Sequence, residues 1–370
     1  MSAFFFLYAA LTPGPSTAPT HMLVSSVSGK PVVCREAMQT DRGCHHIFWV
    51  PLVRHLVRDQ RDLPIALLIF NAAICLVPFA CLVYYSNSHW VGLAYVVFLY
   101  VVFFGRYMSM LHEFVHNRVF TSWWFGFVFV TLLLSAMHGV PAGTYHLNHL
   151  IMHHKGGNAW GVDYSSTERF QRDSFVQFIG YWLRHYTPPG VMVDLVRCCA
   201  RWRKGWLGLV YGASMTGWLA LVWYMWASVH RVGTLWVWMV PMMLSGMAGA
   251  WAGLSTHVFL NPEQPRRWYS YDIINSRANT HHFNQGFHAT HHLDCAYHWT
   301  ELPRGFVRSM AAYRDNGVLI FQEIDNPMLL LWLFLGRYDV VASHMVGFRR
   351  MGQAEAIRLL KAHLRPVVVG

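Results

Sequence analysis

The chain has 370 residues, of which 54% are hydrophobic and only 13% are charged, a composition unlike that of a water-soluble globular protein. It favours a membrane protein, because a helix that crosses about 30 Å of hydrocarbon needs about 20 mostly apolar residues. The net charge of +11 indicates no nucleic-acid partner, since no basic-aromatic nucleic-acid motif is present and basic residues beside apolar spans attract the anionic cytoplasmic leaflet.

The first 45 residues predict a variable extension. The opening "MSAFFFLYAA" is apolar but lacks the positive region of a secretory signal, and "LTPGPSTAPT" after it is typical of a flexible linker. A cleaved targeting segment is the alternative. We therefore place the first domain boundary near residue 45.

Four apolar windows predict transmembrane helices, at residues 64–85, 90–104, 206–228 and 234–258. Arg54, Arg58 and Arg61 precede the first window, whereas the turn "YSNSHW" after it carries no charge. Short loops rich in arginine stay on the cytoplasmic side, so the amino-terminal side is expected inside. A fifth window, 123–140, is shorter than the others.

Three histidine clusters follow in chain order: "HEFVH" at 112–116, "HLIMHH" at 149–154 and "HATHH" at 288–292. Residues four apart share one face of a helix, so His112 and His116 can reach one ion, as can His149 and His153. Clusters on the same side of a membrane predict a metal site, because imidazole suits iron, zinc, copper and nickel. The short window 123–140 must then begin and end on the cytoplasmic side, as an interfacial or re-entrant segment.

These clusters resemble the three histidine boxes of the membrane fatty acid desaturase and hydroxylase superfamily, from about residue 64 to residue 303. The resemblance implies a non-haem di-iron centre with O2 as co-substrate. It also implies a histidine near the cytoplasmic end of the last span, where "GLSTHVFLN" offers His257. The implied iron ligands are His112, His116, His149, His153, His154, His257, His288, His291 and His292, with His146 as an alternative.

Two features depart from the family pattern. Some desaturases carry an asparagine one turn before the last-span histidine, where this chain has Gly253. His281 and His282 form an additional pair close to the third box, and we expect them not to bind iron directly. Metal-bound imidazoles need their second nitrogen held by another group, and the candidates for this second shell are Glu113, Asn117, Asp163, Asn284 and Asp294.

Two rival functions remain open from the residues. "HEFVH" also matches the H-E-x-x-H signature of zinc metalloproteases, with Glu113 as the base, although this explains one cluster and leaves two unused. A metal transporter is the second rival, but transporters usually hold their polar ligands near the membrane midplane, whereas most of these histidines flank the spans.

The expected fold is all-α, with about four transmembrane helices, one interfacial or re-entrant helix and a cytoplasmic helical cap. We expect an extension over 1–45, a desaturase-like membrane domain over 46–312 and a carboxy-terminal segment over 313–370 that covers the site. Lys155, Arg169, Arg172 or Arg184 are candidates for recognising a lipid head group, and residues 163–174 for lining that surface.

The expected reaction is the introduction of a double bond into a fatty acyl chain, with hydroxylation or oxidative decarboxylation as alternatives on the same di-iron site. No haem-binding domain is recognisable, so the electron donor is expected to be a separate protein of the cytochrome b5 or ferredoxin type. The expected location is the endoplasmic reticulum or a bacterial inner membrane, with the active site on the cytoplasmic face.

Overall fold

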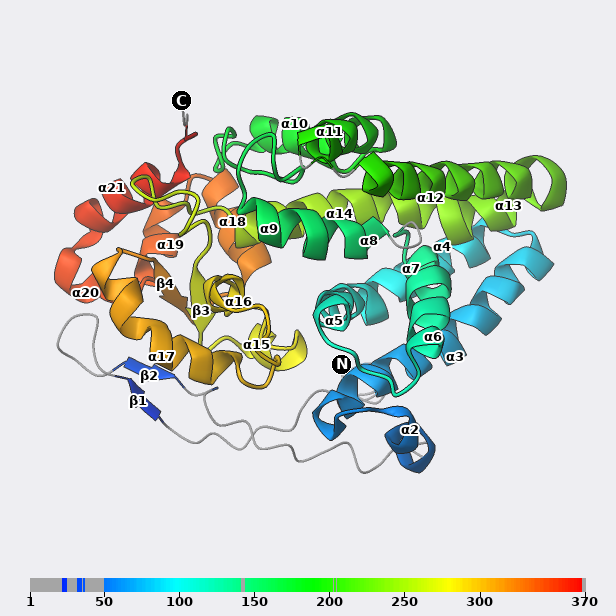
Figure 1. Cartoon of the computed structure of the whole chain (residues 1–370), viewed down its shortest axis with the longest axis horizontal. Coiled ribbons are helices and arrows are strands. Elements are labelled where there is room, and N and C mark those ends of the chain that lie inside the picture. Colours follow the sequence, from blue (N-terminus) through cyan, green and yellow to red (C-terminus); the bar gives the residue numbers. More distant parts are fainter. Residues whose placement is uncertain are drawn as a thin grey trace. The chain divides into compact units, whose positions relative to one another are not determined.

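The computed structural model describes residues 22–24, 32–34, 36, 50–140, 144–201, 203 and 205–367, and it is built mainly from helices (Figure 1). The chain divides into two compact units. Unit 1 comprises residues 1–16, 41–150 and 203–247, and unit 2 comprises residues 17–40, 151–202 and 248–370. The predicted domain boundaries at 45 and 312 do not follow this division and stay a prediction.

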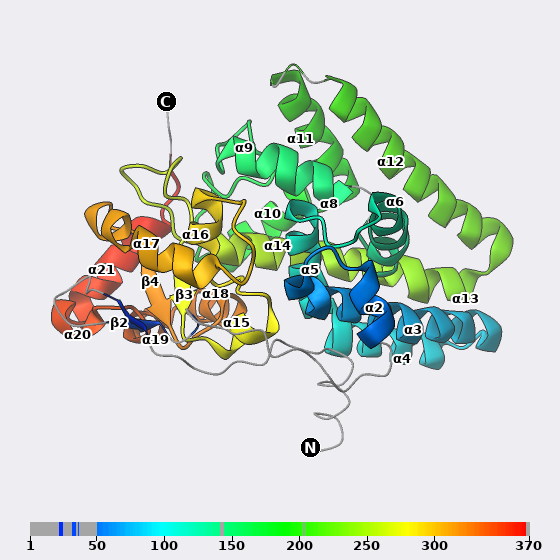
Figure 2. The same ribbon diagram turned by 60° about the horizontal axis from the view of Figure 1, so that its bottom comes forward.

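Unit 1 is organised around long apolar helices. Asn87, the residue after α3, has a left-handed φ of 49° and ends that helix. The Ser88 hydroxyl then accepts a hydrogen bond from the Val91 N–H and caps the start of α4. The two helices consequently pack side by side as a hairpin (Figure 2). The elements of unit 1 are α2 (Val50–Leu56), η1 (Gln60–Asp62), α3 (Leu63–Ser86), α4 (His89–Phe98), η2 (Leu99–Phe104), α5 (Gly105–His116), α6 (Trp123–Phe125), η3 (Gly126–Leu134), α7 (Ser135–Met137), α8 (Thr144–His146), α12 (Gly205–Tyr224), η5 (Met225–Val229), α13 (Arg231–Thr234) and η6 (Leu235–Met239).

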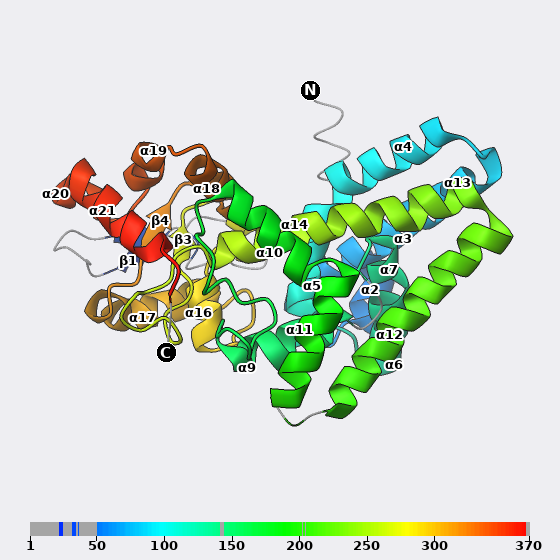
Figure 3. The ribbon, with the colours of Figure 1, turned by 90° about the horizontal axis from the view of Figure 1, so that it is seen from above.

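Three continuous helices in the described part of the chain are long and apolar enough to cross a membrane: Gln60–Ser86, His89–His116 and Arg231–Thr256. They correspond to the first, second and fourth predicted spans, and they support an integral membrane protein. The third predicted window, 206–228, is helical as α12 and η5, and a sharp turn joins it to α13 (Figure 3). This window is not one of the three helices named above, so the expected total of four spans stays a prediction.

Unit 2 carries the shorter helices. They are α9 (His154–Gly156), α10 (Phe175–His185), α11 (Pro188–Arg201), α15 (Arg277–His281), α16 (His288–Leu293), α17 (Leu302–Asp315), α18 (Asn326–Phe334), α19 (Tyr338–Ser343), α20 (Phe348–Met351) and α21 (Gln353–Leu364). Two of the unit boundaries fall within helices, η4 (Leu147–His153) and α14 (Val240–Thr256). Val258, Phe321, Leu330 and Leu360 belong to one buried core, so the carboxy-terminal helices pack against the segment that directly follows His257.

The all-α prediction is correct for most of the chain but missed two small sheets in unit 2. β1 (Met22–Val24) pairs antiparallel with β2 (Val32–Cys34), and β3 (Asp272–Ile274) pairs parallel with β4 (Ile320–Gln322). Each strand has only three residues, too short for the alternation of polar and apolar residues that indicates a strand. β3 lies only fourteen positions before α16 in the chain, and Asp272 at its start contacts that helix.

The amino-terminal extension is described only at residues 22–24, 32–34 and 36. There, Cys34 is fully buried and the Glu36 carboxylate accepts a hydrogen bond from Asn279 Nδ2 at 3.1 Å. Asn279 also binds the backbone of Ile273 and Gly286. This part of the extension therefore packs within unit 2, and the remainder lies outside the described residues.

Arg172 is a structural residue, which corrects its expected role in head-group recognition. Its side chain is 0% exposed and donates to six backbone carbonyls, those of Thr167, Glu168, Phe170, Val258, His363 and Arg365. Burial lowers its pKa to about 9, which still leaves a cation at neutral pH. Arg172 thus ties the loop at 163–174 to the end of the last span and to α21, and it has no access to a lipid.

Candidate metal centre

Four of the predicted iron ligands meet within unit 2. His153, His257, His288 and His292 each offer a ring nitrogen, and these nitrogens all lie within 4.8 Å of one another. His288 Nε2 lies 3.1 Å from His257 Nε2 and 3.1 Å from His292 Nε2. We refer to these residues as the four-histidine group. Converging nitrogens of this kind are an arrangement suited to a metal ion.

Local structure brings these four rings together. His288 and His292 are four residues apart on α16 and therefore project from one face. His153 ends η4, a stretch of π-helix, which is a conformation often found at functional sites. His257 follows the last residue of α14. Its position is fixed by three successive contacts described next.

The segment after α14 folds back along the end of that helix. The Tyr271 hydroxyl donates to the Ser255 carbonyl at 2.7 Å, and the Ser270 hydroxyl donates to the Thr256 carbonyl at 2.8 Å. The third contact of the series joins His257 Nδ1 to the Tyr269 carbonyl at 2.9 Å. His257 is therefore oriented by backbone that is itself held on both sides.

Three of the four imidazoles have Nδ1 engaged on the side away from the other rings. His153 Nδ1 lies 2.7 Å from the Asp163 carboxylate, His257 Nδ1 lies 2.9 Å from the Tyr269 carbonyl, and His292 Nδ1 lies 3.0 Å from the Tyr269 hydroxyl. The carboxylate and the carbonyl can only accept, so they fix the tautomer that leaves the Nε2 lone pair free for a metal, and the hydroxyl holds the direction of the third ring. The donor set consequently fits a metal ion in this group.

Burial favours the neutral form of two of these imidazoles, His257 and His292. It lowers the pKa of His257 to about 3, with the neighbouring His153 adding to the effect, and it lowers the pKa of His292 well below its usual range. For Asp163, burial alone would raise the pKa, but the facing His153 and the hydrogen bonds from Ser165 outweigh it and the pKa is lowered. Neutral imidazoles beside an ionised carboxylate are the protonation states that metal binding requires.

Unit 1 gathers three further predicted ligands. His112 and His116 are four residues apart on α5, and their ring centroids are 5.2 Å apart. The ring centroid of His149 lies 4.4 Å from that of His112 and 5.1 Å from that of His116. The helix over Trp123–Met137 lies between these residues in the chain. His116 and His149 meet although they flank it, which is what a re-entrant or interfacial helix requires. The membrane topology itself stays a prediction.

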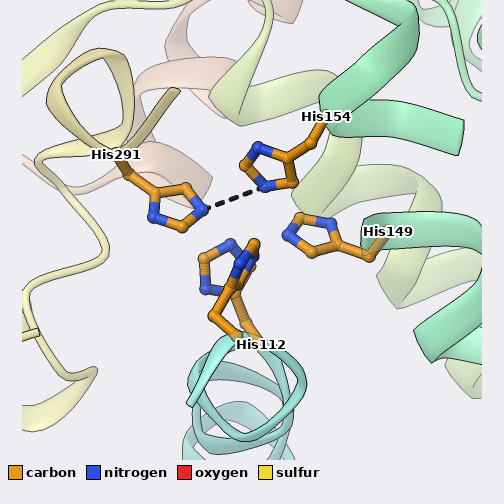
Figure 4. A group of neighbouring side chains, drawn as sticks. His112, His149, His154 and His291 are labelled. Carbon is orange, nitrogen blue, oxygen red and sulfur yellow. Dashed lines mark hydrogen bonds between the residues drawn. The ribbon is translucent and has the colours of Figure 1, made fainter. Parts of the chain in front are cut away.

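The remaining two predicted ligands pair with each other in unit 2. His154 Nε2 lies 3.1 Å from His291 Nε2, and Figure 4 shows the two rings facing each other. Neighbours in sequence therefore belong to different sets, since His153 and His292 are members of the four-histidine group. Adjacent residues on a helix point about 100° apart, which explains this division.

Two of the five residues predicted for a second shell contact a histidine, and their role at a metal stays a prediction. Asp163 contacts His153, and the Glu113 carboxylate lies 3.2 Å from His112 Nδ1. The hydrogen bonds of Asn284 and Asp294 join other groups, the Trp299 carbonyl and the Ala296 N–H. For Asn117 the backbone N–H closes the end of α5 on the Glu113 carbonyl.

The alternative histidines lie apart from these sets. His146 is exposed and belongs to neither group of converging nitrogens, and neither do His281, which is exposed, and His282, which is half-buried. At Gly253, where some relatives are expected to carry asparagine, an added Cβ would collide with the Tyr186 hydroxyl and would lie 3.2 Å from the Tyr181 hydroxyl. The space beside this glycine is filled by phenol groups.

Two residues that sequence reasoning missed support the third box. Tyr269 contacts both His257 and His292, as described above. Asp272 is fully buried, and its carboxylate accepts hydrogen bonds from the Ala289 and Thr290 N–H groups at 2.7 and 3.1 Å and from the Thr290 hydroxyl at 2.6 Å. Asp272 thereby caps the first turn of α16. Both residues lie more than ten positions from the histidines that they support, and no local spacing signals them.

Comparison with known proteins gives a family for the chain. The family model described as "Fatty acid desaturase" matches residues 88–323, a range that includes every histidine of the sets above. Neither a curated protein nor a solved structure matches the chain significantly.

Proposed function

The chain belongs to the fatty acid desaturase family, and on this premise we propose that it is an O2-dependent di-iron oxidoreductase that introduces a double bond into a fatty acyl chain. Family membership makes it a desaturase-like, lipid-modifying oxidoreductase. Its apolar helices are consistent with an acyl substrate held in a membrane. Iron, dioxygen and the outcome of the reaction are parts of the proposal.

The four-histidine group is the observation that supports the proposal most directly. It offers four imidazole nitrogens that lie within 4.8 Å of one another, and three of the rings are oriented through Nδ1. We assign one iron to this group. A second iron is assigned to His112, His116 and His149, which come together in unit 1.

The irons supply oxygen activation and the removal of hydrogen from an unactivated methylene group, which side chains alone do not achieve. The part assigned to the protein is to hold the ligands and to keep water away. His257, His288 and the Asp163 carboxylate are 3%, 5% and 1% exposed, so the ligand atoms lie in a largely dry environment. Such an environment protects a strong oxidant from side reactions.

The zinc-protease alternative is weakened by the position of Glu113. This residue is 1% exposed and its carboxylate is directed to His112 Nδ1 at 3.2 Å, whereas the protease mechanism needs that carboxylate to activate a water. Under the present proposal Glu113→Gln retains measurable oxygenase activity, because a glutamine carbonyl can still accept the Nδ1 hydrogen. A protease would lose essentially all activity.

Electrons are proposed to come from a separate donor of the cytochrome b5 or ferredoxin type, with the site on the cytoplasmic face of the endoplasmic reticulum or a bacterial inner membrane. Lys155 and Arg169 are exposed and remain candidates for contact with an anionic head group. Arg184 is half-buried, with its guanidinium over the Trp160 ring at 4.4 Å.

The test is to incubate purified, iron-loaded protein with a reductant, O2 and a panel of acyl lipids, and to identify the products by mass spectrometry. We expect loss of two hydrogens from an acyl chain. Addition of one oxygen identifies a hydroxylase, and a shortened alkene identifies a decarboxylase. Two irons per chain are expected by elemental analysis, and a protein that holds one zinc and no iron refutes the proposal.

A further inference from the structure

Tyr269 contacts two members of the four-histidine group through two different atoms. Its backbone carbonyl lies 2.9 Å from His257 Nδ1, and its hydroxyl lies 3.0 Å from His292 Nδ1. Its ring is stacked on that of His257, with centroids 5.6 Å apart at 25°, and meets that of His292 at 4.9 Å and 61°. One buried residue thus touches imidazoles that come from α16 and from the end of α14.

We propose that Tyr269 is a positioning residue of the metal centre, and that its hydroxyl sets the metal affinity of the four-histidine group by orienting His292. This inference rests on the proposed function, because it takes a metal ion as the occupant of the group. With Nε2 of His292 directed at the other rings, Nδ1 carries the hydrogen and donates it to the hydroxyl oxygen. The hydroxyl thereby holds the His292 ring in the orientation in which Nε2 is directed at the metal.

The backbone around Tyr269 is rigid enough for this role. The next two residues are anchored to the end of α14, by the hydrogen bond of Ser270 to Thr256 and that of Tyr271 to Ser255. On the other side lies Gly157, the left-handed residue after α9, where an added Cβ would be 3.3 Å from the Arg266 carbonyl and 3.7 Å from Tyr269 Cε1. The contacts of the Tyr269 ring with the rings of His257 and His292 further limit its orientation.

The same task is performed by a different chemical group at His153. There the acceptor is the Asp163 carboxylate, at 2.7 Å, and a carboxylate adds negative charge to the ligand that it orients. A phenol is a neutral acceptor, so it fixes the direction of His292 without that charge. Removing the hydroxyl should therefore reduce orientation and affinity while leaving the ring contacts in place.

The decisive variant is Tyr269→Phe, and Tyr338→Phe is its matched control. Both changes remove one phenol hydroxyl, but the hydroxyl of Tyr338, on α19, donates to the Asp173 carboxylate at 2.7 Å and lies outside the segment that holds His257. The metal-free proteins are titrated with Co2+ and with Fe2+, following the visible spectrum of cobalt and the Mössbauer spectrum of iron. Tyr269→Phe is expected to weaken one of two metal sites by about 10–100-fold, the usual effect of removing an outer partner of a histidine ligand. Its Mössbauer signal should change for one iron alone.

Thermal unfolding with and without metal completes the test, because bound metal raises the melting temperature by mass action. We expect metal-free Tyr269→Phe to melt near the wild type and to gain less from added metal, whereas Tyr338→Phe should gain as much as the wild type. Metal affinities and spectra equal to those of the wild type overturn the inference. So does unfolding of metal-free Tyr269→Phe, since the hydroxyl would then serve the fold. Failure of the wild type to bind two irons counts instead against the proposed function.

Discussion

The wild type is expected to lose stability between acid and neutral pH because of Asp272. Replacing Asp272 with asparagine is expected to remove this loss. Burial raises the pKa of Asp272 to about 6 from 3.8, although hydrogen bonds from Thr290 and Ala289 partly oppose this effect. The folded protein therefore binds the proton more tightly than the unfolded chain does. As the pH rises from about 4 to about 6, the unfolded chain releases this proton while the folded protein retains it, so the stability of the wild type falls.

The size of this loss follows from the change in pKa. A rise of about 2 pK units, at 1.36 kcal/mol for each unit, gives about 3 kcal/mol. Roughly 2 kcal/mol of it falls between pH 4.5 and 7.5. Asparagine does not ionise, and it can keep the cap: its carbonyl accepts the N–H groups of Ala289 and Thr290, while its amide faces the Thr290 hydroxyl. That hydroxyl retains a partner in the Tyr313 hydroxyl at 2.9 Å.

The assay is denaturant unfolding of the metal-free protein in detergent at pH 4.5 and pH 7.5. The wild type and Asp272→Asn are compared at each pH, so that the titration of the histidines, common to both proteins, cancels. Asp325→Asn provides a matched change at another helix cap, since the Asp325 carboxylate accepts the Met328 N–H of α18 at 2.8 Å. Wild type and Asp272→Asn losing stability in parallel between the two pH values refutes the reasoning. Asp272→Ala, which leaves buried N–H groups without an acceptor, should be destabilised at both pH values by about 2–4 kcal/mol.

Three further predictions concern the metal ligands and the buried arginine. His288→Ala should reduce bound iron from about two to about one per chain, as measured by elemental analysis. The control His281→Ala, at an exposed position outside the groups, should keep both irons. Equal iron in the two variants contradicts the ligand assignment. Asp163→Asn should weaken metal binding about 10–100-fold in a Co2+ titration, and an unchanged affinity means that His153 needs no carboxylate. Arg172→Met should lower the free energy of unfolding by at least about 3 kcal/mol, because buried carbonyls lose a charged donor. Arg169→Met, at an exposed position, should shift the melting temperature little. Similar melting of the two variants excludes an anchoring role for Arg172.

The sequence predicted those features of the site that depend on local spacing. His112 and His116 meet because residues four apart on a helix share a face, and the same holds for His288 and His292. The short apolar window after the first box was expected to return to its starting side because its flanking histidines had to meet, and His116 and His149 lie together in unit 1.

Features that depend on contacts between distant segments were not predictable in this way. Arg172 looked like a surface cation, but its carbonyl partners include Val258 and His363, far away in the chain. Tyr269 contacts His257 and His292, and Asp272 caps the helix that carries His288. These contacts join segments that are distant in the chain, and no sequence periodicity predicts them. The strands of three residues were missed for the same reason, since a pairing partner rather than a sequence pattern makes them strands.

The paired histidines of the second and third boxes have a mechanical consequence. On α16, His291 faces His154 while its neighbour His292 joins the four-histidine group. Any rotation of this short helix must therefore displace the rings of His291 and His292 together, in different directions. An adjustment of one ligand set is transmitted to the other through the main chain, without any relay of side chains.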